Sequence, residues 1–251
     1  MASAAEPTSD DALLGGKLVL RQPLRGHRFG HDAVLLAAAT PARKSEHAIE
    51  LGAGVGAAGL ALARRVEGLA VTLVELDPSL TALARDNAAR NLLSERVRAV
   101  CLDAAAPVAQ FVAAGLRPDC ADHVLMNPPF NAPDNPSPDP ARRLARAASP
   151  DMLVQWIDTA ARLLRADGDL TLIWRADGLA DALAALTAGF GAIAIVPVYP
   201  KPQAAAIRVL IRATKDSGAP LAVLPGLILA GSDNKPTARA EAILRDGAAL
   251  V

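Results

Sequence analysis

The sequence predicts an α/β fold in which a mostly parallel sheet carries helices on both faces. Short apolar β runs alternate with stretches of helical spacing along most of the 251 residues, which is the order of elements in parallel α/β sheets. The last two long β runs have no helix between them, so we expect an antiparallel pair at one edge of the sheet. Hydrophobic residues make up 52% of the chain and its formal net charge is +0, which excludes a chain that is disordered throughout.

The individual elements follow from these patterns. Strands are expected at the apolar runs 17–21, 48–51, 71–75, 97–102, 123–126, 170–174, 192–199 and 206–213. Helices are expected at 33–39, 60–65, 78–91, 107–114, 152–164, 179–186 and 238–245. Asp77 suits the N-cap of the third helix and Pro78 its first position. Trp156 and Trp174 belong to apolar patterns, so we expect both in the core, and the apolar stretch 221–230 is either an edge strand or a dimer surface.

The sequence predicts one domain that follows a short tail. Residues 1–12 are small, polar and acidic, which predicts a flexible tail before a single domain at 13–251. This start is not a secretion signal, and no run reaches the about 18 apolar residues of a membrane helix, so we expect a cytoplasmic protein with no membrane partner. Cys101 and Cys120 cannot build a disulfide scaffold, and no metal-ligand cluster is evident. We interpret Cys101 as a small core residue.

A glycine-rich turn follows the strand at 48–51. Gly52, Gly54 and Gly56 come directly after Glu50 and before a helix, where glycines let the backbone turn sharply and pass close to a ligand. An ordinary strand-to-helix turn is the alternative. The spacing differs from the G-x-G-x-x-G of dinucleotide sites, and no Walker lysine follows. Because Glu50 would repel a pyrophosphate, the turn suits a cationic ligand without phosphate, such as S-adenosylmethionine.

Acidic residues end the next two predicted strands. Glu75 closes the second strand of the sheet, and Asp103 with Ala104 follows the third. In α/β folds, ligands bind outside the carboxyl ends of the strands, and an acid at the end of the second strand holds the ribose hydroxyls. We therefore expect Glu50, Glu75 and Asp103 to face one edge of the sheet.

The fourth predicted strand runs into Asn127-Pro128-Pro129-Phe130. Two prolines stiffen the turn, and the Asn127 side chain and the Pro128 carbonyl can both accept hydrogen bonds from one amino group. Phe130 can stack on a flat ring. A plain proline-rich turn is the alternative, but the place of this tetrapeptide, in a sheet whose first strand carries the glycine turn, favours a chemical site.

In combination, these motifs resemble the amino-group methyltransferases that use S-adenosylmethionine on a Rossmann-like, class I methyltransferase fold. The resemblance implies a seven-stranded sheet whose last strand is antiparallel. A narrower similarity, carried by residues 14–36, 206–213 and 237–244, is to the tRNA adenine-N6 methyltransferases that act on valine tRNA. The sequence departs from that group at His31, where threonine is expected, and at Glu50, where aspartate is commoner.

The resemblance implies methyl transfer to the exocyclic N6 amine of an adenine in tRNA. Asn127 and the Pro128 carbonyl would hold the amine, Pro129 would stiffen the turn, and Phe130 would hold the base flat. The residues implied to bind S-adenosylmethionine are Asp32, Glu50, Gly52, Gly54, Gly56, Glu75, Asp103, Ala104 and Asn127. The resemblance also implies that residues 13–45 are a substrate or cofactor lid at the start of the methyltransferase domain.

RNA is therefore the expected partner, and arginines near the catalytic turn and ahead of the core are the candidate contacts: Arg21, Arg25, Arg28, Arg142, Arg143 and Arg146. A solvated face balanced by acids is an equal alternative for them. Two other acceptors for the same chemistry are guanine in rRNA and a glutamine amide in a protein. A non-catalytic S-adenosylmethionine- or RNA-binding module is a further alternative, and the sequence makes no prediction of the oligomeric state.

Overall fold

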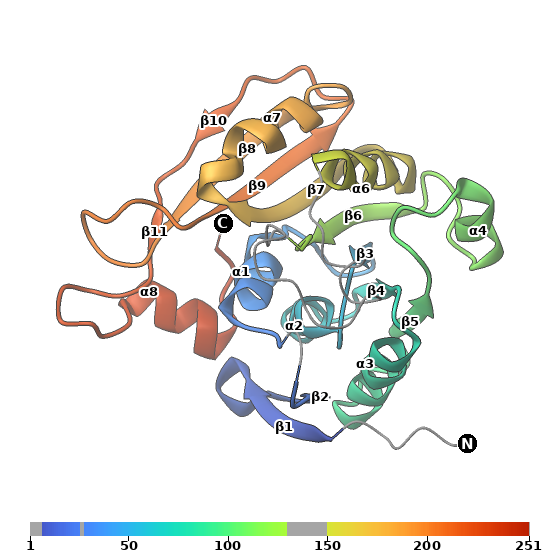
Figure 1. The fold of residues 1–251 in the computed structure, drawn as a ribbon, viewed down its shortest axis with the longest axis horizontal. Helices are drawn as coiled ribbons and strands as arrows, with labels where there is room; N and C mark the ends of the chain where they lie inside the picture. The colour runs from blue at the N-terminus through green and yellow to red at the C-terminus, as the bar shows by residue number, and fades with distance from the viewer. Residues whose placement is uncertain (1–6, 26–27, 130–149, 251) are drawn as a thin grey trace.

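The computed structural model describes residues 7–25, 28–129 and 150–250. A nine-stranded sheet, with helices on either side, occupies the centre of the molecule (Figure 1). Its strands are β3 (His47–Leu51), β4 (Ala70–Glu75), β5 (Val97–Cys101), β6 (Ala121–Met126), β7 (Leu164–Arg175), β8 (Phe190–Tyr199), β9 (Arg208–Lys215), β10 (Ala222–Val223) and β11 (Leu227–Ile228).

The strand order confirms the predicted topology. The sheet runs β10-β8-β9-β7-β6-β3-β4-β5, with β11 also pairing with β8. The five strands β3 to β7 pair in parallel, and β9 is antiparallel to both β7 and β8. The seven strands β3 to β9 thus form the predicted sheet, which is parallel except for β9. The apolar stretch 221–230 adds the two short strands β10 and β11, which pair in parallel with β8, so its edge-strand interpretation is confirmed for four of its residues.

Helices cover both faces of the sheet. The first core cluster contains side chains from α1 (His31–Ala39), α2 (Ala57–Arg65) and α3 (Pro78–Arg90). The second contains side chains from α4 (Val108–Ala113), α6 (Pro150–Leu163) and α7 (Leu179–Leu186), together with Trp156 and Trp174. Figure 1 shows α1 and α2 on one side of the sheet and α6 and α7 on the other. Because each face is covered, the central strands are apolar on both sides.

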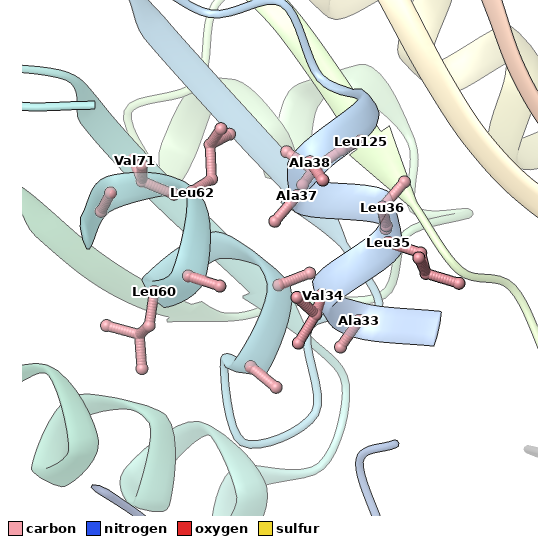
Figure 2. Close-up of a cluster of buried hydrophobic side chains, with 14 of the residues drawn as sticks. Ala33, Val34, Leu35, Leu36, Ala37, Ala38, Leu60, Leu62, Val71 and Leu125 are labelled. Carbon is pink, nitrogen blue, oxygen red and sulfur yellow. The ribbon is translucent and has the colours of Figure 1, made fainter. Parts of the chain in front are cut away.

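The sheet face that α1 and α2 cover is packed mainly by alanine and leucine. Residues 33–39 of α1 and 57–63 of α2 are all buried, and Figure 2 shows the two helices side by side, with Leu36, Leu60 and Leu62 among the labelled side chains. Alanine favours helix and has no side-chain entropy to lose. A chain with only 3% aromatic residues therefore fills this layer with many small contacts.

The N-terminal region differs from the sequence prediction. Residues 8–12, predicted to be part of a flexible tail, lie in β1 (Thr8–Leu13), which pairs antiparallel with β2 (Leu18–Pro23) through a short 3-10 turn at Leu14–Gly16; residues 1–6 lie outside the described part. The predicted lid 13–45 contains α1, whose buried residues pack in the core; its role as a lid stays a prediction.

Predictions for single residues and for the C-terminal helix had mixed outcomes. Asp77 caps α3 as predicted, because its Oδ1 accepts hydrogen bonds from Ser79 N at 2.7 Å and Leu80 N at 3.3 Å. Cys101, predicted to be in the core, is exposed, since it ends the edge strand β5. The C-terminal helix begins as α8 (Ala238–Glu241) and continues as a π-helical turn at Ala242–Asp246. Within the described ranges, no helix has the length and apolar character needed to cross a membrane.

Truncating a side chain in the α1–α2 layer should lower the free energy of unfolding markedly. Leu36 is 0% exposed, so Leu36→Ala should cost about 2–5 kcal/mol through lost burial and a cavity. Urea denaturation gives the value. Val223→Ala, at a residue that is 67% exposed, is the control and should change stability by less than about 0.5 kcal/mol. Equal losses at the two sites would contradict the burial of α1.

Candidate active site

Four parallel strands bring the predicted site residues to one edge of the sheet. Leu51 at the end of β3 is in register with Val74 of β4 and Met126 of β6. Glu75 is in register with Cys101 of β5. The segments that follow these strands carry the glycine turn, Glu75, Asp103 and Asn127. Parallel strands end at a common edge, which is where α/β folds bind ligands.

The glycine turn depends on left-handed backbone at its three glycines. The φ angles are +68° at Gly52, +56° at Gly54 and +87° at Gly56, a region in which other residues pay a steric cost. A Cβ on Gly52 would overlap the Trp156 ring, whereas a Cβ on Gly54 would have no heavy atom within 4 Å. The middle of the turn therefore offers bare backbone to a ligand, and its first glycine is fixed by α6.

Glu75 links the end of β4 to the glycine turn. Its Oε2 accepts a hydrogen bond from Gly54 N at 2.7 Å, and its Oε1 accepts one from Asp77 N at 2.8 Å. The side chain is mostly buried, and burial raises the pKa of this carboxyl although the backbone donors oppose the shift. Glu75 thus lies at the predicted edge and holds the turn there. Its predicted contact with a ribose stays a prediction.

Glu50 has a different environment from the one predicted. Its side chain is buried, and its Oε2 accepts a hydrogen bond from Gly59 N in the first turn of α2 at 2.7 Å. Burial raises the pKa of Glu50 to about 8, with Glu75 adding to the rise and the Gly59 donor opposing it. The carboxyl therefore joins β3 to α2 from inside the protein instead of facing the sheet edge. Its contact with a ligand stays a prediction.

Asn127 follows β6 directly and carries an unused acceptor. Its Oδ1 is buried and accepts no hydrogen bond within the part of the chain that the structure describes, a state that costs free energy until a donor reaches it. Pro128 is buried and Pro129 is partly buried. Phe130, predicted to hold a base, lies outside the described residues.

The remaining predicted site residues have local partners. Asp103 is exposed and accepts a hydrogen bond from Ala105 N at 2.8 Å, and Ala104 beside it is buried. Asp32 lies in the first turn of α1 and forms an ion pair with Arg208 at 2.9 Å. Arg208 is in register with Arg175, the last residue of β7, so Asp32 also lies at the carboxyl edge of the sheet.

Two of the three candidate RNA-binding arginines ahead of the core have acidic partners, while Arg25 is exposed. Arg21 lies 3.3 Å from Asp10 and 3.6 Å from Asp86, and Arg28 lies 2.8 Å from Asp11. These pairs support the alternative of a charge-balanced surface. Three other candidates, Arg142, Arg143 and Arg146, lie outside the described residues. In the part of the chain that the structure describes, no three His, Cys, Asp or Glu side chains are grouped as a metal site requires.

Sequence reasoning missed two residues that support the glycine turn. Trp156 was predicted to be in the core, but its contact with Gly52 was not. Asn87 of α3 is fully buried and donates a hydrogen bond to the Val55 carbonyl at 3.0 Å. A possible signal was the occurrence of Asn87 and Asn91 one turn apart in an alanine-rich helix, because asparagine disfavours helix interiors unless its amide is used.

The buried Glu50 carboxyl predicts a specific dependence of stability on pH. From its ordinary pKa of 4.5 to about 8, the folded chain holds a proton at Glu50 that the unfolded chain has released. This contribution to the free energy of unfolding is complete below the lower value and is lost as the pH rises through the upper one, by at most about 1.4 kcal/mol per pH unit.

Glu50→Gln removes the titration and keeps an acceptor for Gly59 N. The stability of the wild type relative to this variant should therefore fall from pH 5 to about pH 8, and urea denaturation across that range measures it. Glu95→Gln, at an exposed position, is the matched control and should leave the pH profile unchanged. A Glu50→Gln profile parallel to that of the wild type would contradict the proposed protonation.

Comparisons with known proteins agree with this architecture. Residues 28–198 match the methyltransferase small domain family. Two relatives named tRNA1(Val) (adenine(37)-N6)-methyltransferase are similar: the Tolumonas auensis protein is 29% identical over 163 residues, or 64% of this chain and 65% of that protein. The Porphyromonas gingivalis protein is 33% identical over 158 residues, or 61% of each chain. The chain thus matches somewhat less than two thirds of the length of these relatives.

A solved structure is similar over a larger share. A predicted O-methyltransferase, protein Atu636 from Agrobacterium tumefaciens, is 30% identical with a TM-score of 0.74, covering 87% of this chain and 97% of that one. This agreement confirms the Rossmann-like class I methyltransferase fold. With the family match extending from the start of α1 almost to the end of β8, the chain belongs to the methyltransferase small domain family.

Proposed function

We propose that this chain transfers a methyl group from S-adenosylmethionine to the N6 amine of an adenine in tRNA. The observation that carries the proposal is the buried, unpartnered Oδ1 of Asn127, which follows β6 beside the glycine turn of β3. A buried acceptor next to a turn of bare backbone suits a reaction that places an amino group against a bound methyl donor.

The residues at the sheet edge fit S-adenosylmethionine. In this proposal, the backbone of Gly52, Gly54 and Gly56 would bind its amino-acid half, and Glu75 at the end of β4 would accept from the ribose hydroxyls. Asp103 and Ala104, after β5, would bind its adenine. When bound, S-adenosylmethionine supplies the methyl group from a positively charged sulfonium.

Asn127 Oδ1 and the Pro128 carbonyl hold the adenine amine in place and polarise it. The adenine amino nitrogen is a weak nucleophile because its lone pair is delocalised into the ring. Two N–H groups donating to Asn127 Oδ1 and the Pro128 carbonyl would favour tetrahedral nitrogen and localise the lone pair. The nitrogen gains the methyl group as the bond from carbon to sulfur breaks, and it then releases one proton to solvent. Positioning and preorganised dipoles supply the rate, so no strong base is required.

The names of the relatives favour adenine in tRNA as the substrate. Both relatives described above carry tRNA adenine-N6 methylation in their names, and the Asn127-Pro128-Pro129 turn suits a planar amine. Within this proposal, Phe130 stacks on the base, and Arg142, Arg143 and Arg146 contact the RNA backbone. A cytoplasmic location, where tRNA is available, belongs to the same proposal. Asp32, held by Arg208 at 2.9 Å, is a further residue proposed to contact S-adenosylmethionine.

The experiment is incubation with labelled S-adenosylmethionine and undermodified total RNA, followed by digestion to nucleosides and mass spectrometry. The proposal expects labelled N6-methyladenosine in the tRNA fraction. Labelled methylguanosine, or label on a protein glutamine, would keep the chemistry and overturn the substrate. Binding of S-adenosylmethionine without transfer to any acceptor would favour a non-catalytic module and overturn the proposed activity.

Asn127→Ala should separate binding from chemistry. Removing the acceptor should lower kcat by at least about 100-fold, the size expected when one preorganised polar contact to the reacting group is lost. The Kd for S-adenosylmethionine, measured by calorimetry, should change by less than about threefold because the glycine turn and Glu75 remain. Near-normal turnover in this variant would exclude the proposed role of Asn127.

A further inference from the structure

The Asn87 side chain, in the last turn of α3, makes three hydrogen bonds to backbone groups of other segments. The residue is 0% exposed. Its Oδ1 accepts a hydrogen bond from Arg21 N at 2.7 Å, and its Nδ2 donates to Arg21 O at 2.9 Å and to Val55 O at 3.0 Å. One amide group therefore connects three segments: strand β2, helix α3 and the glycine turn.

The contact with Val55 controls a peptide group inside the turn. Val55 lies between Gly54 and Gly56, and Gly56 N donates to Ala53 O at 2.8 Å. The peptide group that joins Val55 to Gly56 is thus held at both ends, its carbonyl by Asn87 and its N–H by Ala53. Glycine backbone has a wide range of accessible conformations, so the turn needs contacts of this kind to keep one shape.

Asn91, one helical turn later, provides a natural comparison. Its Oδ1 accepts from Val19 N and its Nδ2 donates to Val19 O, both at 3.0 Å. Asn87 and Asn91 therefore pair with β2 in the same way, as a neighbouring strand would. The difference is that Asn87 alone of these two also bonds to the glycine turn in the described structure.

We propose that Asn87 is a positioning residue that couples the docking of the β1–β2 hairpin to the shape of the S-adenosylmethionine-binding turn. The hairpin fixes the Asn87 amide through Arg21, and the amide fixes the Val55 carbonyl. This inference rests on the proposed function, because it takes S-adenosylmethionine to be the ligand of the turn. Asn87 acts through the backbone and has no part in the methyl-transfer step.

Comparing Asn87→Ala with Asn91→Ala tests the coupling. Both variants lose a pair of hydrogen bonds to β2, so both should lower the melting temperature. Only Asn87→Ala should weaken S-adenosylmethionine binding, by about tenfold, the effect expected for one buried hydrogen bond that preorganises a site. In the tRNA assay, its KM for S-adenosylmethionine should rise by a similar factor with a much smaller change in kcat.

The outcomes are distinct. Equal affinities in the two variants would overturn the coupling, since a merely structural role predicts only the shared loss of stability. Failure of the wild type to bind S-adenosylmethionine would overturn the proposed function and this inference together. Asn87→Asp is a second variant of nearly equal volume. Its carboxylate can accept from Arg21 N but cannot donate to Val55 O, so it should also weaken binding.

Hydrogen exchange on the wild-type protein gives a test that does not depend on how the variants fold. Coupling between two sites is reciprocal. Bound S-adenosylmethionine should therefore slow exchange at the Arg21 amide, which is bonded to Asn87, more than at the Val19 amide, which is bonded to Asn91. Equal changes at the two amides, or no change at Arg21, would overturn the inference.

Discussion

The register of the parallel strands is the constraint on which the site depends. Leu51, Val74 and Met126 stand side by side across three neighbouring strands, so the segments that follow them must emerge at the same edge. That register is held by packing on both faces, with α1 and α2 on one side and α6 on the other. A shift of one residue in a strand would turn its side chains to the opposite face and move Asn127 away from its place beside the glycine turn.

Buried polar groups then give the glycine turn a single conformation. Glu75 accepts from Gly54, Glu50 accepts from the first turn of α2, and Asn87 donates to Val55. Each of these side chains would cost free energy to bury without its backbone partner. The turn and its supports therefore stabilise one another, and the bare backbone at Gly54 stays open to a ligand. We infer that precision at this edge comes from the surrounding side chains and not from the glycines themselves.

Charged side chains on and around the N-terminal hairpin form ion pairs with one another. The acids of β1 and α3 pair with Arg21, Arg28 and Arg90 on the N-terminal hairpin and its surroundings. Exposed pairs of this kind contribute little to stability and are screened by salt, but they leave this surface without a strong net charge. A polyanionic substrate would gain little there, so recognition of RNA would depend on groups elsewhere on the chain.

The sequence by itself determined the alternation of strands and helices, the antiparallel pair at the edge, the cap at Asp77 and the grouping of Gly52, Glu75, Asp103 and Asn127 at one edge. These features depend on hydrophobic periodicity and on turn residues, which lie close together in the sequence. The order of elements then allows few topologies. Tertiary structure decided what depends on distant partners. It placed residues 8–12 in a strand, because β2 offered a partner, and left Cys101 exposed at an edge strand. It turned Glu50 inward to α2 and brought Asn87 to Val55 and Trp156 to Gly52. The contacts of Asn87 with Val55 and of Trp156 with Gly52 join segments that are tens of residues apart, and their geometry is set only when the helices pack on the sheet.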